Sequence, residues 1–141
     1  MAAVMKSVLY YTPEQSPKVN TLKGIFVRLG IRIKNIAPEQ VNQQVGYLAG
    51  LPGFEEQSMA GELPVIKEEV LVLKNFTSQD IDVLLQHIKK AGLPRIALKA
   101  VLTESNSKWT FYQLYQEIKE EHEVMSGRAA SKKDGEDILN S

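Results

Sequence analysis

Two short polar loops carry the residue types in this chain that could bind a small ligand. They are "TPEQSP" at residues 12–17 and "NFTSQ" at residues 75–79, and each precedes a helical pattern. Hydroxyl and amide groups beside the free backbone N–H groups of a helix N-terminus can hold a small anion. The candidate ligand-binding residues are Thr12, Ser16, Asn75, Thr77 and Ser78. The simpler interpretation, which we favour, is that these side chains cap their own helices, because every helix needs caps.

Residue spacings typical of catalysis or metal binding are not found in the sequence. The chain has no Cys, which excludes thiolate ligands and Cys nucleophiles. His87 and His122 form no H-E-x-x-H spacing, and Ser105 and Ser107 have no His–Asp partners. We expect His87 to be partly buried in a structural role and His122 to interact with a helix C-terminus. The sequence therefore predicts no catalytic residue, no metal and no cofactor, and favours a protein that is not an enzyme.

The bulk composition restricts the partners of the chain. Its 141 residues suit one domain, and 17 Lys and Arg balance 17 Asp and Glu. Zero net charge argues against a general nucleic-acid binder, and we expect the basic cluster of Lys89, Lys90, Arg95 and Lys99 to face solvent. The sequence shows neither a signal-peptide pattern nor an apolar run of about 20 residues. We therefore expect a cytoplasmic protein without a membrane partner.

The first half of the chain, residues 7–50, alternates strand and helix patterns. Apolar runs rich in β-branched residues indicate strands, and apolar positions at helical spacing indicate helices. Pro at the start and Gly at the end delimit both helices. The predicted elements are a strand at 7–12, a helix from Pro17 to Gly30, a strand at 31–37, and a helix beginning at Pro38 with Val41, Val45 and Leu48 on its apolar face.

The same order returns in residues 68–125, after a connector at 51–67 that is rich in Gly and Pro. Thr77 with Asp80, and Thr110 with Gln113, resemble capping boxes, and Trp109 with Leu114 occupies the positions of a hydrophobic staple. The last 16 positions are small, charged and aperiodic. The predicted elements are a strand within 68–76, a helix from Thr77 to Gly92, a strand at 95–103, a helix from Thr110 onward, and a flexible polar tail at 126–141.

The two halves resemble an internal repeat, because the interval from Val8 to Val70 equals the interval from Gly30 to Gly92. Repeated β-α-β units favour parallel pairing. We predict an α/β fold with a four-stranded, mainly parallel sheet of order 2-1-3-4 and helices on both faces; a ferredoxin-like α+β fold is the alternative. In the predicted sheet a ligand would bind at the switch point between strands 1 and 3, where the loops at 12–17 and 75–79 would meet.

The second half, residues 68–123, resembles a known family. The matching features are the apolar strand, "AVLTESN" at 100–106, "WT" at 109–110 and "KEEHE" at 119–123. This combination is similar to the small bacterial domain-of-unknown-function family 3783, which implies no established activity or cofactor. The resemblance suggests that Thr103, Asn106, Trp109, Thr110 and His122 form the family pattern on this sequence.

Two classes of function follow from these observations. The preferred class is a non-enzymatic binding or regulatory module that contacts a protein or a small-molecule effector. For a protein partner, the expected surface is the last helix with the turn at 106–115, where Tyr112 lies off the apolar stripe. The alternative class is a protein, or an enzyme, that binds a small anion or nucleotide with the helix N-termini at the switch point. A homodimer is compatible with both classes.

Overall fold

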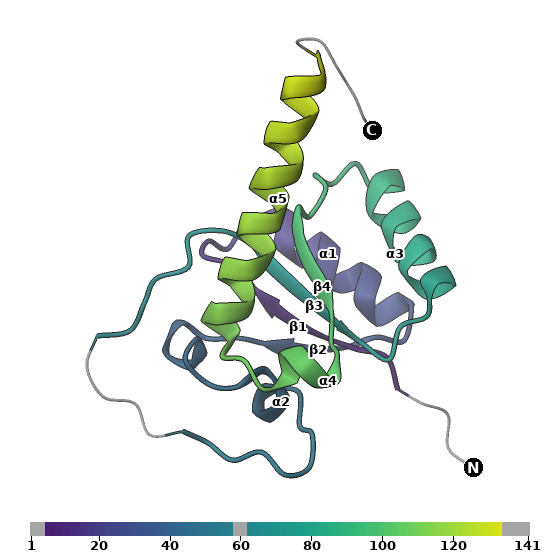
Figure 1. Cartoon of the computed structure of the whole chain (residues 1–141). Helices are drawn as coiled ribbons and strands as arrows, with labels where there is room; N and C mark the ends of the chain where they lie inside the picture. Colours follow the sequence, from purple (N-terminus) through teal and green to yellow (C-terminus); the bar gives the residue numbers. More distant parts are fainter. Residues whose placement is uncertain (1–4, 58–61, 134–141) are drawn as a thin grey trace.

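The structure is a computed structural model that describes residues 5–57 and 62–133. Strands and helices alternate along most of the chain, and a long connector joins α2 to β3 (Figure 1). The elements are β1 (Ser7–Tyr11), α1 (Pro17–Arg28), β2 (Arg32–Asn35), a 3-10 turn η1 (Pro38–Gln40), α2 (Val45–Leu48), β3 (Val70–Lys74), α3 (Ser78–Lys90), β4 (Leu98–Val101), α4 (Glu104–Ser107) and α5 (Phe111–Lys133).

The four strands form one sheet of order β2-β1-β3-β4, as predicted. β1 pairs in parallel with β2, and β3 pairs in parallel with β4, so each half contributes one parallel pair. The central pair is antiparallel, with Ser7 opposite Lys74 and Tyr11 opposite Val70. The predicted fold class is therefore confirmed, and the ferredoxin-like alternative is not observed. The antiparallel centre has a consequence for the predicted site, because β1 and β3 end at opposite edges of the sheet.

Both faces of the sheet are covered by helices, because buried apolar residues alternate between the two faces along the strands. Helices α1 and α3 pack on one face, and α2, α4 and α5 lie on the other (Figure 1). The neighbouring residues Tyr10 and Tyr11 show the alternation. Tyr10 packs edge-on against Phe26 of α1, whereas Tyr11 packs against Phe111 of α5, with ring centroids 6.3 Å and 6.2 Å apart. Two separate cores therefore stabilise one sheet.

The two halves are related by an approximate twofold rotation about an axis normal to the sheet. Residue pairs that face each other across the halves mark this axis: Leu9 pairs with Val72, and Gln44 forms a bridge with Thr110. Around the bridge, Val45 N–H donates to the Trp109 carbonyl at 2.8 Å, and Phe111 N–H donates to the Gln43 carbonyl at 2.9 Å. These reciprocal bonds make each half hold the start of the other half's last helix.

The turns before the bridge also correspond. The Gln40 side chain accepts a hydrogen bond from Ala37 N–H at 2.8 Å, and the Asn106 side chain accepts one from Thr103 N–H at 2.8 Å. The twofold axis makes Val8 of β1 equivalent to Leu71 of β3, which is one residue beyond the Val70 that the sequence interval matched to Val8. Val8 lies in the same core as Leu71, whereas Val70 lies in the core on the opposite face. A shift of one residue in a strand exchanges the faces, so the sequence interval matched residues that point in opposite directions.

The predicted helix beginning at Pro38 is wrong as one continuous element. The chain forms the 3-10 turn η1, then extended backbone at Gln44, and then the single turn of α2. A continuous helix would bond Val45 N–H to the Val41 carbonyl. Here Val45 N–H donates to the Trp109 carbonyl and the Val41 carbonyl accepts Tyr112 N–H, both at 2.8 Å, so the other half takes both groups. The apolar face was nevertheless predicted correctly, since Val41, Val45 and Leu48 are all buried. The sequence also missed the short helix α4.

Helix α5 extends further than the sequence indicated. It continues to Lys133, so residues 126–133 are helical where the start of a polar tail was predicted. The remainder of the predicted tail, residues 134–141, lies outside the described residues. Among the helices described, none combines the length and apolar character needed to cross a membrane.

Candidate ligand-binding site

The five predicted binding residues do not come together. Because β1 and β3 are antiparallel, the loop after β1 and the loop after β3 lie at opposite edges of the sheet. The predicted switch point, where both loops would meet, is therefore wrong. Thr12 and Ser16 lie at one edge, and Asn75, Thr77 and Ser78 lie at the other.

At the β3 end, the polar side chains are occupied by local structure. Thr77 caps α3 in a box with Asp80, with hydrogen bonds of 2.9 Å and 3.1 Å. The bond from Thr77 N–H holds the pKa of the Asp80 carboxyl below its ordinary value. Asn75 adopts a left-handed backbone, and its amide donates to the Met5 carbonyl at 2.8 Å. Ser78 is exposed in the first turn of α3. At this end the capping interpretation holds for Thr77.

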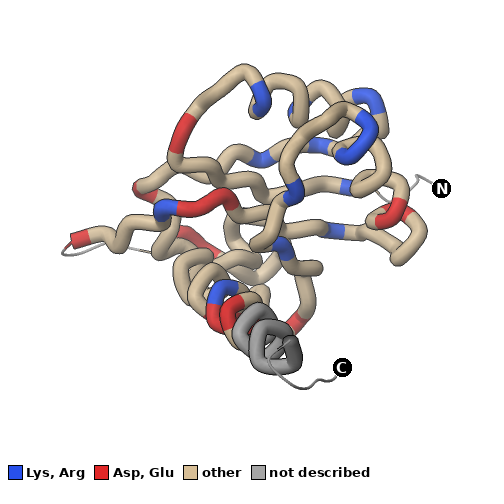
Figure 2. Tube along the Cα trace, turned by 90° about the horizontal axis from the view of Figure 1, so that it is seen from above, with Lys and Arg blue, Asp and Glu red and all other residues tan. Residues whose placement is uncertain are grey.

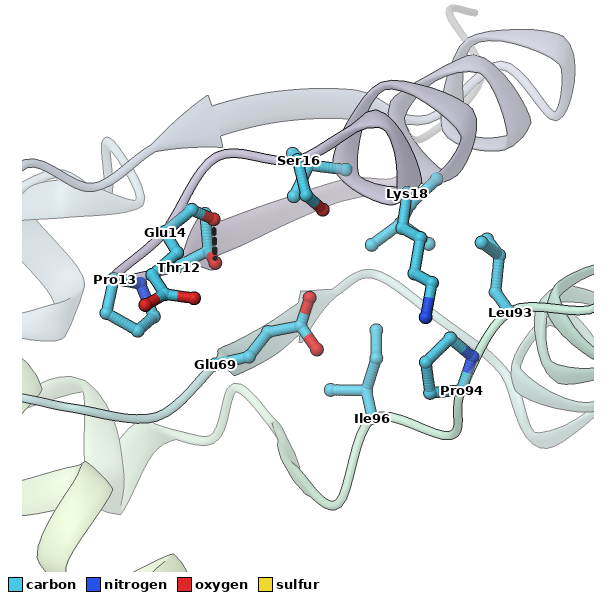
Figure 3. Close-up of a pocket in the computed structure, with 11 residues that line it drawn as sticks. Thr12, Pro13, Glu14, Ser16, Lys18, Glu69, Leu93, Pro94 and Ile96 are labelled. Atoms are coloured by element: carbon cyan, nitrogen blue, oxygen red, sulfur yellow. Dashed lines mark hydrogen bonds between the residues drawn. The ribbon is translucent and has the colours of Figure 1, made fainter.

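At the β1 end, Thr12 and Ser16 line a cavity of about 250 Å³ beside the start of α1 (Figure 3). Ser16 is the N-cap residue of α1, but its side chain makes no capping hydrogen bond. The Thr12 hydroxyl donates to the Glu14 carbonyl at 2.9 Å. The capping interpretation therefore fails for Ser16, whose hydroxyl lines the cavity.

Four residues of the family pattern have structural roles. Thr103 and Asn106 cap α4 reciprocally, and the buried Asn106 amide also donates to the Val101 carbonyl at 3.0 Å. Trp109 is half-buried against the core beneath α5, and Thr110 bridges to Gln44 and accepts a hydrogen bond from Gln113 N–H. These residues build the turn that joins β4 to α5.

The remaining candidates are exposed or packed. His122 is exposed on α5, and His87 is exposed on α3 rather than partly buried as expected, because it lies off the face that carries Leu84 and Ile88. Tyr112, expected to be exposed, is partly buried against the core. Within residues 5–57 and 62–133, no group of three or more His, Cys, Asp or Glu side chains could hold a metal ion.

A second, larger cavity was not foreseen from the sequence. It has a volume of about 550 Å³ and lies over the β1–β2 side of the sheet, between β2, the end of α2 and the end of β3. Its lining includes Ser7 and Leu9 of β1, and Gln40 and Tyr47 from η1 and α2. We call it the basic cavity, because three cations line it: Arg32, Lys34 and Lys74.

The electrostatic character of the basic cavity follows from its lining. None of its described lining residues is acidic. The Lys74 ammonium is fixed by donating to the Ala49 carbonyl at the end of α2, at 3.0 Å. Arg32 and Lys34 are exposed and make no ion pair with any residue that the structure describes. In Figure 2 most Lys and Arg positions lie on one side of the Cα trace and many Asp and Glu positions lie on the other. The basic cavity therefore carries a local excess of positive charge in a chain of zero net charge, with open hydrogen-bond donors.

The twofold relation explains why this cavity exists in the first half. The equivalents of four of its sheet residues lie beneath α5, in or against the core. The helix equivalent to α5 is α2, which is a single turn and leaves the matching part of the sheet uncovered. Ser7, Arg32, Lys34 and Lys74 correspond to Val70, Leu98, Ala100 and Tyr11.

A signal for the basic cavity was present in the sequence. In "IRIKN" at residues 31–35, cations alternate with isoleucines, which is typical of a strand with one solvated face. The sequence could not show that Arg32 and Lys34 lie near Lys74. Their proximity depends on the pairing of β1 with both β2 and β3.

Comparison with known proteins assigns the second half of the chain. Residues 69–125 match the family model for a domain of unknown function, DUF3783, as the resemblance predicted. The match runs from β3 into α5 and leaves the basic cavity's strand, β2, outside it. Comparison with curated proteins and with solved structures gave no match. The family assigns no activity, so function must be argued from the cavities.

Proposed function

We propose that the chain is a non-enzymatic binding module whose effector is a small anion held in the basic cavity. One observation supports this above all: Arg32, Lys34 and Lys74 converge on one cavity whose described lining has no carboxylate. Isolated cations beside donor groups favour an anionic group such as phosphate or carboxylate, since hydrogen bonds between ionised partners are the strong ones. The Ser7 and Tyr47 hydroxyls and the Gln40 amide add neutral donors.

The shape of the cavity supports a ligand larger than a bare ion. Its volume of about 550 Å³ falls within the range of roughly 300–1,000 Å³ that small-molecule sites occupy. Leu9, Ile33 and Leu48 provide apolar surface next to the cations. A phosphate ester or an organic acid of metabolite size would use both.

Binding without catalysis is favoured by the groups that line this cavity. A hydroxyl becomes a nucleophile beside a base such as His or a carboxylate. Ser7 and Tyr47 have no such neighbour among the described lining residues, and His87 and His122 belong to other elements. The alternative function, an anion or nucleotide site built from two helix N-termini at a switch point, loses its geometric basis.

The proposal includes an origin for the cavity by duplication. Two β-α-β units with matching turns and a reciprocal bridge support an ancestral repeat. In this account one copy kept a long last helix for stability, and the other kept a short one and gained charges for binding.

The test is an amide NMR titration of the full chain with inorganic phosphate, a nucleoside monophosphate and citrate. We expect shifts at Ser7, at 32–35, at 47–50 and at 74–75, and an affinity that falls as salt is raised. The double variant Arg32→Ala/Lys34→Ala should weaken binding by on the order of tenfold or more. These two side chains are exposed, so the fold should persist.

A matched control distinguishes binding at the basic cavity from general electrostatic attraction of anions to the protein. Arg28→Ala/Lys90→Ala removes the same charge from exposed positions on α1 and α3, outside the cavity. Its affinity should stay within about twofold of the unmodified chain. Equal losses in both double variants, or the absence of shifts at the cavity with all three anions, would refute the proposed site.

A further inference from the structure

The smaller cavity, which Thr12 and Ser16 line, lies on the opposite face of the sheet and at the opposite end of β1 from the basic cavity. Figure 3 shows that its walls come from the end of β1, the start of α1, the start of β3 and the loop that follows α3. The two cavities share no lining residue, so a ligand here would occupy a site separate from that of the anion proposed for the basic cavity.

An oriented carboxylate lies on one side of this cavity. Glu69 comes from the residue before β3, and its Oε2 accepts a hydrogen bond from the buried hydroxyl of Tyr10. Burial, together with Glu69, raises the pKa of Tyr10, so the phenol keeps its proton and donates. The hydrogen bond from Tyr10 uses one of the two carboxylate oxygens of Glu69. In Figure 3 the carboxylate group lies near Ile96 and Pro94.

An ammonium group faces the same cavity without neutralising that carboxylate. Lys18, in the first turn of α1, extends toward Pro94 and the loop after α3 (Figure 3). No ion pair within 4.0 Å joins Lys18 to Glu69 or to Glu14, the other acid in the lining, among the pairs found in the described residues. Opposite charges that share a cavity but are not paired can each receive a charge from a ligand.

The third feature is an apolar wall. Val19 and Leu22 of α1 and Ile96 are buried, and Leu93 and Pro94 complete the wall beside them. The volume of about 250 Å³ lies just below the roughly 300 Å³ at which sites for drug-sized ligands begin, which suits a smaller metabolite.

We propose that this cavity binds a free α-amino acid with an apolar side chain. Its ammonium group lies at Glu69, with Glu14 nearby, and its carboxylate pairs with Lys18. The side chain packs against Leu93 and Ile96. A simple amine would leave Lys18 without a partner, and a simple carboxylic acid would place its charge beside two acids.

The experiment uses the full chain and three probes that share one side chain: L-leucine, leucine amide and 4-methylpentanoic acid. Amide NMR should show shifts at Thr12, Ser16, Lys18 and Ile96 with leucine. The amide and the acid, which each lack one charge, should bind at least about tenfold more weakly. Equal affinity for either analogue, or no shift with leucine, phenylalanine or alanine, would overturn the proposal.

Two variants test the assigned contacts. Glu69→Gln keeps an acceptor for Tyr10, so it removes the charge while preserving the fold, and Lys18→Gln changes an exposed residue. Each should reduce leucine affinity at least about tenfold. The controls Glu39→Gln and Lys108→Gln alter exposed charges elsewhere and should leave it unchanged. Unchanged leucine affinity in both cavity variants would contradict the assignment, whatever the phosphate titration shows at Arg32.

Discussion

The two halves of this chain share one plan and use the same sheet positions for opposite purposes. In the second half, Leu98 and Ala100 of β4 lie in or against the core beneath a helix of 23 residues. In the first half, the equivalent positions of β2 carry the cations Arg32 and Lys34 around an open cavity, beside a helix of only 4 residues. The length of one helix therefore decides whether a sheet surface becomes core or site, because uncovered apolar residues there would be exposed to water.

The largest expected effect contrasts equivalent residues in β2 and β4. Leu98→Ala should lower the free energy of unfolding by about 2–5 kcal/mol, since it opens a cavity in the core where Leu98 is 3% exposed. Arg32→Ala, at the equivalent exposed position, should change it by less than about 0.5 kcal/mol. Urea denaturation of both variants measures the difference. Similar losses would mean that the halves do not differ as described.

The second prediction concerns α2, the short last helix of the first half. A Cβ at Gly46 would lie 2.6 Å from the ring of Phe54 in the connector, so Gly46→Ala should destabilise by about 1–3 kcal/mol. Gly24→Ala in α1 is the control: a Cβ there meets nothing within 4 Å, and the change should stabilise by about 0.5–1 kcal/mol. Thermal melts would show opposite shifts. A neutral Gly46→Ala would show that Phe54 does not pack on α2.

The third prediction uses the equivalent turns before the bridge. Thr103 caps α4 by accepting a hydrogen bond from Asn106 N–H at 3.0 Å, whereas its counterpart Ala37 has no hydroxyl. Thr103→Ala should therefore cost about 1 kcal/mol in chemical denaturation. The reciprocal change Ala37→Thr should cost less than this or be neutral. A neutral Thr103→Ala would remove the capping explanation for this residue of the family pattern.

The smallest expected effect is a pH dependence in the second half. Glu68 accepts hydrogen bonds from Lys119 and Tyr115, at 3.0 Å and 2.8 Å, and these bonds hold its pKa below the ordinary value of 4.5. A depressed carboxyl pKa stabilises the fold above the unfolded value, and this contribution is lost as the pH falls through the folded value. Because the side chains of Glu68 and Lys119 are 43% and 41% exposed, the contribution of Glu68 should be below about 1 kcal/mol.

The control for this effect is Glu68→Gln, which cannot titrate. Denaturation of both chains at pH 7 and at pH values below 4.5 should show a stability difference at neutral pH that shrinks on acidification. A difference that stays constant with pH would mean that Glu68 makes no charge-dependent contribution.

Most of the fold was predictable because its elements are delimited by local chemistry. Pro17 begins α1, Gly30 and Gly92 end helices with left-handed backbone, and Thr77 caps α3, all as the sequence indicated. The strand order followed from the repeated β-α-β pattern. Such signals act over a few residues, and they identified the four strands and the helices α1, α3 and α5, although the ends of some of these elements differed.

The site was less predictable, because it depends on the relative orientation of the halves. No local pattern distinguishes parallel from antiparallel pairing of β1 and β3, and that pairing separated Thr12 from Asn75. The break between η1 and α2 was missed for a similar reason, since the bonds at Gln43 come from Phe111 in the other half. Contacts between distant segments, rather than propensity, decided both features.

The alternation of cations along β2 has a further consequence for the exposed rim of the sheet. An edge strand presents unpaired backbone groups on which a strand of another molecule can add, and charged side chains oppose such growth. A second copy aligned symmetrically along β2 would place Arg32 and Lys34 beside like charges, which repel when they face each other across strands. We therefore expect the residues that we assign to ligand binding to oppose aggregation along this edge as well.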